Sequence, residues 1–150
     1  MEEDNSLART DEVVKLAHEW IGTPYHHQAS VKGVGADCIG IVRGLYRDLY
    51  GIEPPELINY SADWGDVNGK EDLVTTAFKY LEPVPIEERQ PGHVLVMRWK
   101  KSRVAKHVMI MTESNKAIHS YNRSVTTEIH LSRWWIDKIA YVFAFPQEVK

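Results

Sequence analysis

Apolar residues recur at helical spacing in the first half of the chain and predict three helices. Asp37 is predicted to cap the second helix, because its carboxylate can accept a hydrogen bond from a free amide of the first turn. Gly51 is predicted to end that helix, with Pro54 and Pro55 just beyond. Thr10 is predicted to cap the first helix. The three predicted helices cover residues 10–20, 38–50 and 70–81.

After Gly92 the pattern changes to short apolar runs that are typical of β-strands. A turn at residues 114–116 is predicted to join two of these runs, and Ser132 to cap a short helical turn. Trp134 and Trp135 in that turn are interpreted as packing residues, with a sugar-stacking platform as the alternative. Helices followed by strands favour an α+β fold with an antiparallel sheet. The predicted strands are residues 94–97, 107–111, 117–121, 128–130 and 139–145.

Two segments read as connections rather than regular elements. Residues 52–69 contain prolines, glycines and aromatic residues, and are interpreted as an irregular connection that contributes to a substrate groove. Residues 100–103 form a basic turn between two predicted strands.

Composition narrows the class of protein. The 150 residues include 18 basic and 21 acidic side chains, a net charge of −3, which gives no general attraction to nucleic acid or to an anionic membrane. Five tryptophans and seven tyrosines indicate a folded chain, and a single cysteine excludes an internal disulfide. We expect a disordered or frayed start at residues 1–9 and one domain over residues 10–150.

The start of the chain bears on where the protein acts. Residues 1–5 are acidic and show no apolar segment of the kind found in secretory signals. The expectation is synthesis in the cytoplasm without a signal peptide, and no membrane or nucleic-acid partner.

The single cysteine, Cys38, follows a glycine-rich stretch and stands at the predicted start of a helix. The partial positive charge of a helix N-terminus favours a thiolate over a thiol, and a thiolate is the nucleophilic form. The alternative is that Cys38 is a small buried hydrophobic residue, as free cysteines often are. The spacing by itself leaves both interpretations open.

A cysteine nucleophile needs a base, and the base needs a group that orients it. Of seven histidines, His107 begins one predicted strand and His119 lies near the end of the next. Pairing of these strands would bring the two imidazoles together on one face. Cys38 on a helix packed against a sheet that carries the histidine is a papain-like layout.

Four short segments in this order resemble the NlpC-type cell-wall cysteine peptidases, and within them the short phage-tail and gene-transfer-agent branch. The similarity extends from about Val13 to about Pro146, nearly the whole chain. The segments are WIGTPY at 20–25, GADCIG at 35–40, KHVMI at 106–110 and AIHS at 117–120.

The resemblance assigns a role to each candidate site residue. It implies that Cys38 is the nucleophile, His107 its base and His119 the residue that orients the base. Tyr25 matches a tyrosine near the thiol that helps to bind the oxyanion. Asp37 matches an aspartate that also belongs to the substrate-recognition region.

The same resemblance implies a fold, a reaction and partners. The fold would be a papain-like α+β domain with the nucleophile helix packed on a C-terminal antiparallel sheet. The reaction would be amide hydrolysis in peptidoglycan stem peptides through an acyl-thioester, with no metal or organic cofactor. The partners would be the stem-peptide substrate and phage-like tail proteins, and the protein would be incorporated in a particle tail that acts on the cell wall.

Two departures from the family pattern and two alternative functions accompany this interpretation. Ile39 replaces a serine that can contact substrate, and His93 replaces the aspartate of a Gly-Asp-Val segment. Cys38, His107 and His119 could instead bind Zn²⁺ with an open fourth position, as in a zinc hydrolase. A tail-assembly protein that keeps the fold with little activity is the non-enzymatic alternative.

Overall fold

The structure, a computed structural model, describes residues 2–54, 72–100, 105, 107–121 and 124–150. Most of the predicted connection at 52–69 and of the basic turn at 100–103 lies outside the described residues. The helices are α1 (Glu2–His18), α2 (Cys38–Tyr50), α3 (Asp72–Tyr80) and α4 (Arg133–Ile136), with a 3₁₀ turn at Ile86–Glu88. The strands are β1 (Ser30–Val31), β2 (Gly35–Ala36), β3 (Glu82–Val84), β4 (Val94–Met97), β5 (His107–Glu113), β6 (Lys116–His119), β7 (Thr127–His130) and β8 (Ile139–Ala144).

Six strands form one antiparallel sheet in the order β3-β8-β4-β5-β6-β7. In the centre of the sheet, Met97 pairs with His107 and Ile110 pairs with Ile118. β1 and β2 form a separate short hairpin just before α2. Helices that mostly precede an antiparallel sheet confirm the predicted α+β class.

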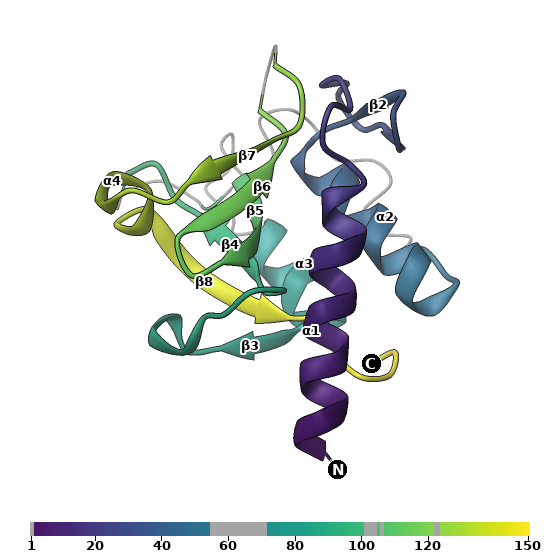
Figure 1. The fold of residues 1–150 in the computed structure, drawn as a ribbon, viewed down its shortest axis with the longest axis vertical. Coiled ribbons are helices and arrows are strands. Elements are labelled where there is room, and N and C mark those ends of the chain that lie inside the picture. Colours follow the sequence, from purple (N-terminus) through teal and green to yellow (C-terminus); the bar gives the residue numbers. More distant parts are fainter. Residues whose placement is uncertain (1, 55–71, 101–104, 106, 122–123) are drawn as a thin grey trace.

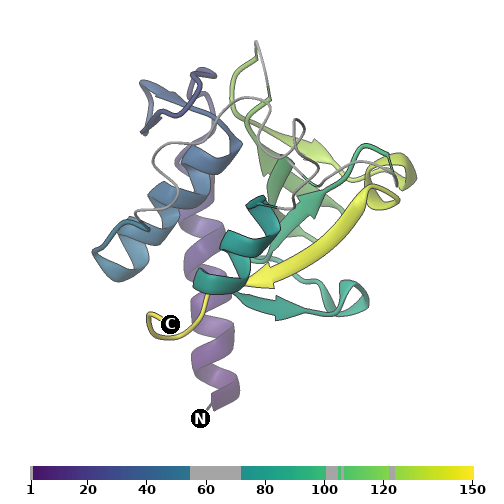
Figure 2. The ribbon, with the colours of Figure 1, turned by 180° about the vertical axis from the view of Figure 1, so that it is seen from behind.

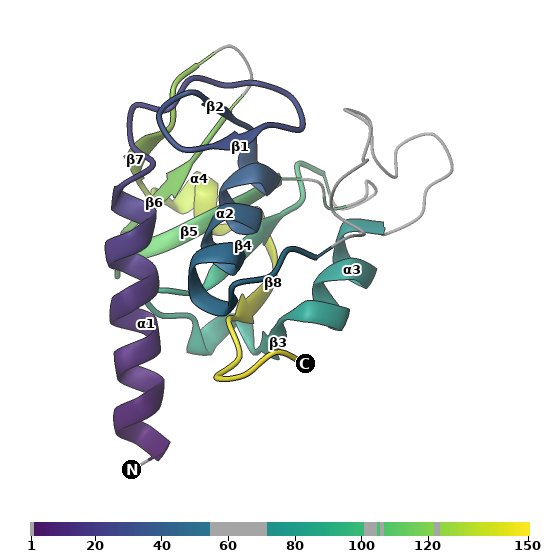
Figure 3. The ribbon, with the colours of Figure 1, turned by 90° about the vertical axis from the view of Figure 1, so that its right-hand side faces the viewer.

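The sheet is covered on both faces (Figures 1, 2 and 3). α1, α2 and α3 lie on one face, whereas α4 lies on the other, as Figure 3 shows most clearly. Because side chains alternate along a strand, β4 and β5 contribute to both layers. The helix-side core includes Val94, Val96, Val108, Ile110, Ile118, Leu45, Tyr46 and Trp20. The α4-side core includes Leu95, Met97, Met109, Met111, Ala117, Leu131 and Val142.

Helix α1 begins at Glu2, so the predicted helix start at Thr10 is wrong, and residues 2–9, predicted to be frayed, are helical. The segment 2–18 contains neither glycine nor proline to stop a helix. The division into a start and one domain over 10–150 stays a prediction.

Helix α2 begins and ends as predicted. Asp37 is its N-cap and accepts the Gly40 amide, and Gly51 closes it in the left-handed conformation with φ of 75°. The helix also packs unusually closely: a Cβ at Gly44 would lie 2.1 Å from the Trp20 ring. Glycine at position 44 therefore lets the α1–β1 connection lie directly against α2.

No helix in the described ranges is both long enough and apolar enough to cross a membrane.

Candidate active site

Cys38 is the first residue of α2 and is half-buried. The backbone N–H groups of Val108, of Ile39 and of Cys38 itself lie near its sulfur and act to lower the pKa of the thiol. Val108 follows His107 in β5, so the sulfur lies at the start of that strand, one residue along from the predicted base.

Asp37 fixes the backbone on both sides of the cysteine. Its Oδ1 accepts the Gly40 amide at 2.7 Å, and its Oδ2 accepts the Gln28 amide at 2.8 Å. A Cβ at Gly40 would lie 1.9 Å from the Ala29 carbonyl oxygen, so only glycine permits this approach of loop and helix. The buried carboxylate therefore joins the first turn of α2 to the loop that precedes β1.

A second polar network holds the same loop against the side of α2. The largely buried Arg43 forms an ion pair with Glu53 and donates to the Gln28 carbonyl at 2.9 Å. Arg47 donates to the Ser30 carbonyl at 2.7 Å and to Glu53 at 3.1 Å. These contacts fix residues 28–30 relative to the helix that carries Cys38.

His107 and His119 meet as strand pairing predicted. His107 Nε2 lies 3.0 Å from His119 Nδ1, and both side chains are buried. The sheet register explains the contact: Ile110 pairs with Ile118, so His107 lies opposite position 121 and diagonal to His119 on the same face. The predicted approach of the two rings is confirmed, whereas their catalytic roles stay predictions.

Aromatic side chains surround the two imidazoles. The Trp99 ring stacks on His107 with centroids 5.4 Å apart and an interplanar angle of 24°. Tyr121 stands edge-on to His107 at 5.3 Å and lies nearly parallel to His119 at 6.0 Å. Trp135 of α4 stands edge-on to His119 at 5.6 Å. We call Trp99, Tyr121 and Trp135 the aromatic clamp.

The sequence interpretation did not identify Trp99 or Tyr121 as site residues. Finding them needs the strand register as well as strand alternation: Trp99 lies two residues beyond Met97, and Met97 pairs with His107. Tyr121 likewise lies two residues beyond His119. Trp134 packs edge-on against Trp135 at 4.8 Å, with Lys138 over its ring at 5.1 Å and the Trp99 ring tilted by 30° to it at 6.2 Å. Trp134 is 55% exposed, so both the packing interpretation and the sugar-platform alternative stay predictions.

Burial favours the neutral form of both reactive groups. Burial first, and the nearby Asp37 carboxylate second, raise the pKa of the Cys38 thiol to about 12. Burial likewise lowers the pKa of His107 to about 3, assisted by the neighbouring His119. The helix start was expected to favour a thiolate, and this expectation is wrong: desolvation and the carboxylate that caps the helix raise the pKa of Cys38, and the backbone donors offset only part of this rise.

Tyr25 lies near the cysteine, as predicted. Burial, followed by the charges of Asp37 and Cys38, raises the pKa of its hydroxyl. Its backbone amide donates to the Ser124 carbonyl at 2.9 Å, and Ser120 donates to the Ala36 carbonyl at 2.8 Å. The loop after β6 is thereby attached to the residues just before Cys38.

The structure does not bring every pair of predicted groups into contact. Within the described residues, no hydrogen bond joins the Cys38 sulfur to the His107 ring. No group of three or more His, Cys, Asp or Glu side chains in this described part is arranged to hold a metal ion. Because His107 Nε2 and His119 Nδ1 are directed at each other, the arrangement gives the zinc alternative no support.

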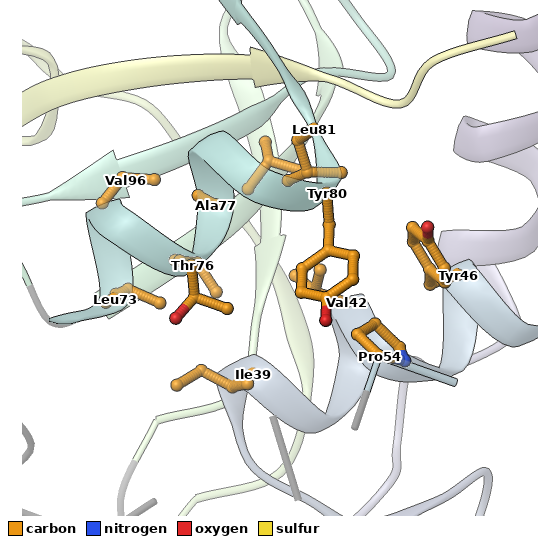
Figure 4. Close-up of a pocket in the computed structure, with 12 residues that line it drawn as sticks. Ile39, Val42, Tyr46, Pro54, Leu73, Thr76, Ala77, Tyr80, Leu81 and Val96 are labelled. Carbon is orange, nitrogen blue, oxygen red and sulfur yellow. The ribbon is translucent and has the colours of Figure 1, made fainter. Parts of the chain in front are cut away.

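Ile39 is packed in the hydrophobic core next to Cys38. Its side chain is 5% exposed and lines an apolar cavity of about 30 Å³ between α2, α3 and the sheet (Figure 4). Leu73 and Thr76 of α3 and Val108 of β5 line the same cavity. The residue that departs from the family pattern therefore contributes to the core.

His93 is a structural residue at the opposite end of β4 from the site. Its Nδ1 accepts the Gln90 amide at 3.2 Å, and burial lowers its pKa. Val94 beside it pairs with Ile110, three residues along β5 from His107. The histidine at position 93 therefore closes a local turn.

Comparison with known proteins adds family information to this geometry. The structure resembles the NlpC/p60 domain of the peptidoglycan hydrolase SagA, with a TM-score of 0.61, 17% identity, and coverage of 91% of this chain and 98% of that one. An NlpC/P60 family protein from Bacillus cereus ATCC 10987 aligns with a TM-score of 0.64 and 19% identity over 91% of this chain and 40% of its own. NlpC2 from Trichomonas vaginalis aligns with a TM-score of 0.62 and 15% identity over 91% of this chain and 46% of its own.

The chain thus spans less than half the length of the last two structures. A comparison with curated protein sequences gives no match. These structural likenesses establish the NlpC/P60 papain-like fold, as the resemblance implied. The sequence model of the NlpC/P60 family matches residues 22–143, a range that includes Cys38, His107 and His119, and the chain belongs to this family.

Proposed function

We propose that the protein is a cysteine peptidase that hydrolyses amide bonds in peptidoglycan stem peptides. One observation carries the proposal. Cys38 is the first residue of α2 and lies beside the start of β5, and His107, the first residue of β5, is hydrogen-bonded to His119. Membership of a family whose members are generally cysteine peptidases and peptidoglycan hydrolases supports the substrate class.

In the proposed mechanism, His107 takes the thiol proton as the Cys38 sulfur attacks the substrate carbonyl. The bond to the leaving amine then breaks, His107 returns the proton to the amine, and an acyl-thioester remains. A water molecule, deprotonated by His107, attacks the thioester and releases the acid and the free thiol. Backbone amides at the start of α2 and the Tyr25 hydroxyl would bind the oxyanion.

The neutral resting state shapes the first step. With the pKa of Cys38 raised to about 12 and that of His107 lowered to about 3, a separated thiolate and imidazolium are disfavoured before substrate arrives. Proton transfer then accompanies attack on the carbonyl. His107 Nε2 would donate its hydrogen to His119 Nδ1, which leaves His107 Nδ1 as the acceptor for the thiol proton.

Digestion of defined muropeptides by the purified protein tests this function, with product masses identifying the bond cut. Hydrolysis by the native protein that persists with a chelator and disappears in Cys38→Ala supports the thiol mechanism. Full activity of Cys38→Ala would overturn the nucleophile assignment, and loss of activity with chelator alone would favour the zinc alternative.

We further propose that the protein serves a phage or gene-transfer-agent tail, first made in the cytoplasm and then incorporated in the particle that acts on the cell wall. The support is the motif resemblance to the short phage-tail branch, from WIGTPY through AIHS. Particles that carry Cys38→Ala distinguish enzyme from assembly protein. Normal assembly with poor entry supports catalysis in the tail, whereas failed assembly supports the alternative of a tail-assembly protein with little activity.

A further inference from the structure

The His107–His119 bond fixes only one point of the base. A single hydrogen bond holds His107 Nε2 at 3.0 Å from its partner, but it leaves the ring plane free to pivot about that contact. Torsions that end in an imidazole ring are broad, so side-chain preference adds little restraint. A base that must present its other nitrogen to a thiol needs a second restraint.

Trp99 supplies a flat surface against the face of that ring. The two ring planes are 24° apart with centroids at 5.4 Å, an offset-stacked arrangement, and Trp99 is half-buried. Trp99 follows β4 and is itself supported by Trp135 at 5.9 Å and Tyr121 at 5.9 Å. The indole is therefore held in place by neighbours on two other segments.

The remaining members of the aromatic clamp restrain the pair from its other sides. Tyr121 is edge-on to His107, with an interplanar angle of 88°, and Trp135 is edge-on to His119 at 84°. Of the three, only Trp99 covers the face of His107. Rotation of the His107 ring would therefore collide first with Trp99.

We propose that Trp99 is a positioning residue that holds the His107 ring in the plane in which Nε2 meets His119 and Nδ1 receives the Cys38 proton. The expected effect of Trp99 on kcat rests on the proposed function. The expected effect of Trp99 on the orientation and tautomer of the His107 ring does not depend on that function. The low pKa of His107 agrees with a ring covered on its face, because burial is the first cause of that shift.

Nuclear magnetic resonance of the ring nitrogens, with ¹⁵N-labelled histidine, tests the structural content directly. The native protein is expected to show His107 in one tautomer with hydrogen on Nε2, and no titration of the ring in the neutral pH range. Trp99→Ala is expected to mix the two tautomers and to move the pKa of His107 upward. Trp99→Phe keeps a flat face and is expected to restore the native signals.

Trp134→Ala is the matched control, because Trp134 belongs to the same cluster but has no ring contact with either histidine in the described residues. If Trp99→Ala does not fold, Trp99→Leu keeps apolar volume without a flat face and takes its place. An unchanged His107 tautomer and titration in Trp99→Ala or Trp99→Leu would overturn the proposal.

The kinetic arm uses muropeptide hydrolysis. Trp99→Ala is expected to lower kcat by about 10-fold with KM little changed, since a misdirected base loses part of its usual contribution. A change in KM alone would overturn positioning and make Trp99 a substrate contact. A native protein with no hydrolytic activity would count against the proposed function, while the resonance measurements would still decide the role of Trp99.

Discussion

The two halves of the candidate site are held by different forces. The Cys38 half is built from backbone and charged groups: Asp37 bonds two amides, and Arg43 and Arg47 share Glu53. The His107 half is built from rings packed across neighbouring strands. Individual hydrogen bonds fix the position of the backbone around Cys38, whereas flat rings restrict the orientation of the imidazoles. Substitutions should therefore act differently in the two halves.

Removing the reactive group of either half should have the largest effect. Cys38→Ala is expected to lower muropeptide hydrolysis by at least about 1,000-fold, and His107→Asn by at least about 100-fold, since nucleophile and base act as a unit. Initial rates of hydrolysis measure these losses, and thermal unfolding curves of the same variants show that each one is folded. His130→Ala, at an exposed position on β7, is the control and should keep native activity. Comparable losses in that control would contradict the assignment.

The orienting residue should matter less than the base that it orients. His119→Asn is expected to reduce kcat by about 10-fold, because an amide can still accept the His107 Nε2 hydrogen but in a different position. Parallel kinetics of His107→Asn and His119→Asn measure the difference. A larger loss in His119→Asn than in His107→Asn would reverse the two roles.

Gly40→Ala tests the close packing of the Cys38 half. The added methyl group would lie 1.9 Å from the Ala29 carbonyl oxygen, so the loop must move away from the helix. We expect the free energy of unfolding to fall by about 1–3 kcal/mol, the usual cost of overpacking. Denaturant titration measures it, with Asp48→Ala on the exposed side of α2 as control. Equal stability of the two variants would show that the loop yields at little cost.

Acid should destabilise the fold through the His107 half. The pKa of His107 is about 3 in the folded protein and about 6.5 when unfolded, so the unfolded chain binds the extra proton first. Its contribution to stability is complete above pH 6.5 and is lost as the pH falls toward 3, at up to about 1.4 kcal/mol per pH unit. His93 and His119 add in the same direction, since burial lowers the pKa of both. Unfolding curves between pH 7 and pH 4 should be less steeply pH-dependent in His107→Asn than in the native protein.

The smallest expected effect concerns the carboxylate beside the thiol. Asp37→Asn keeps a capping oxygen for the Gly40 amide but removes the negative charge that helps to raise the pKa of Cys38. We expect alkylation of Cys38 by iodoacetamide at pH 7.5 to become about threefold faster, which corresponds to a pKa lower by about half a unit. An unchanged rate would mean that burial alone sets the pKa of the thiol.

Local signals in the sequence predicted the features that depend on local chemistry. The aspartate before the cysteine and the glycine after the helix marked both ends of α2, because caps are formed by residues adjacent to the helix. Strand periodicity also anticipated that His107 and His119 would meet. The start of α1 was missed, because a polar segment carries no apolar periodicity although nothing in it opposes a helix.

Features that depend on the tertiary environment were not predictable in the same way. The charge state expected for Cys38 was wrong, because desolvation is set by what packs over the residue and not by its place in the helix. The direction of the Ile39 side chain depends on α3, which lies more than thirty residues away in sequence. Trp99 and Tyr121 became visible only once the strand register was known.

A thiol that stays protonated at rest has a consequence for the durability of the protein. Peroxides oxidise the thiolate form of cysteine, through sulfenic acid to irreversible products. With a pKa of about 12, Cys38 presents almost no thiolate at neutral pH. The burial that raises the pKa of Cys38 therefore also lowers the rate at which peroxides can oxidise its sulfur.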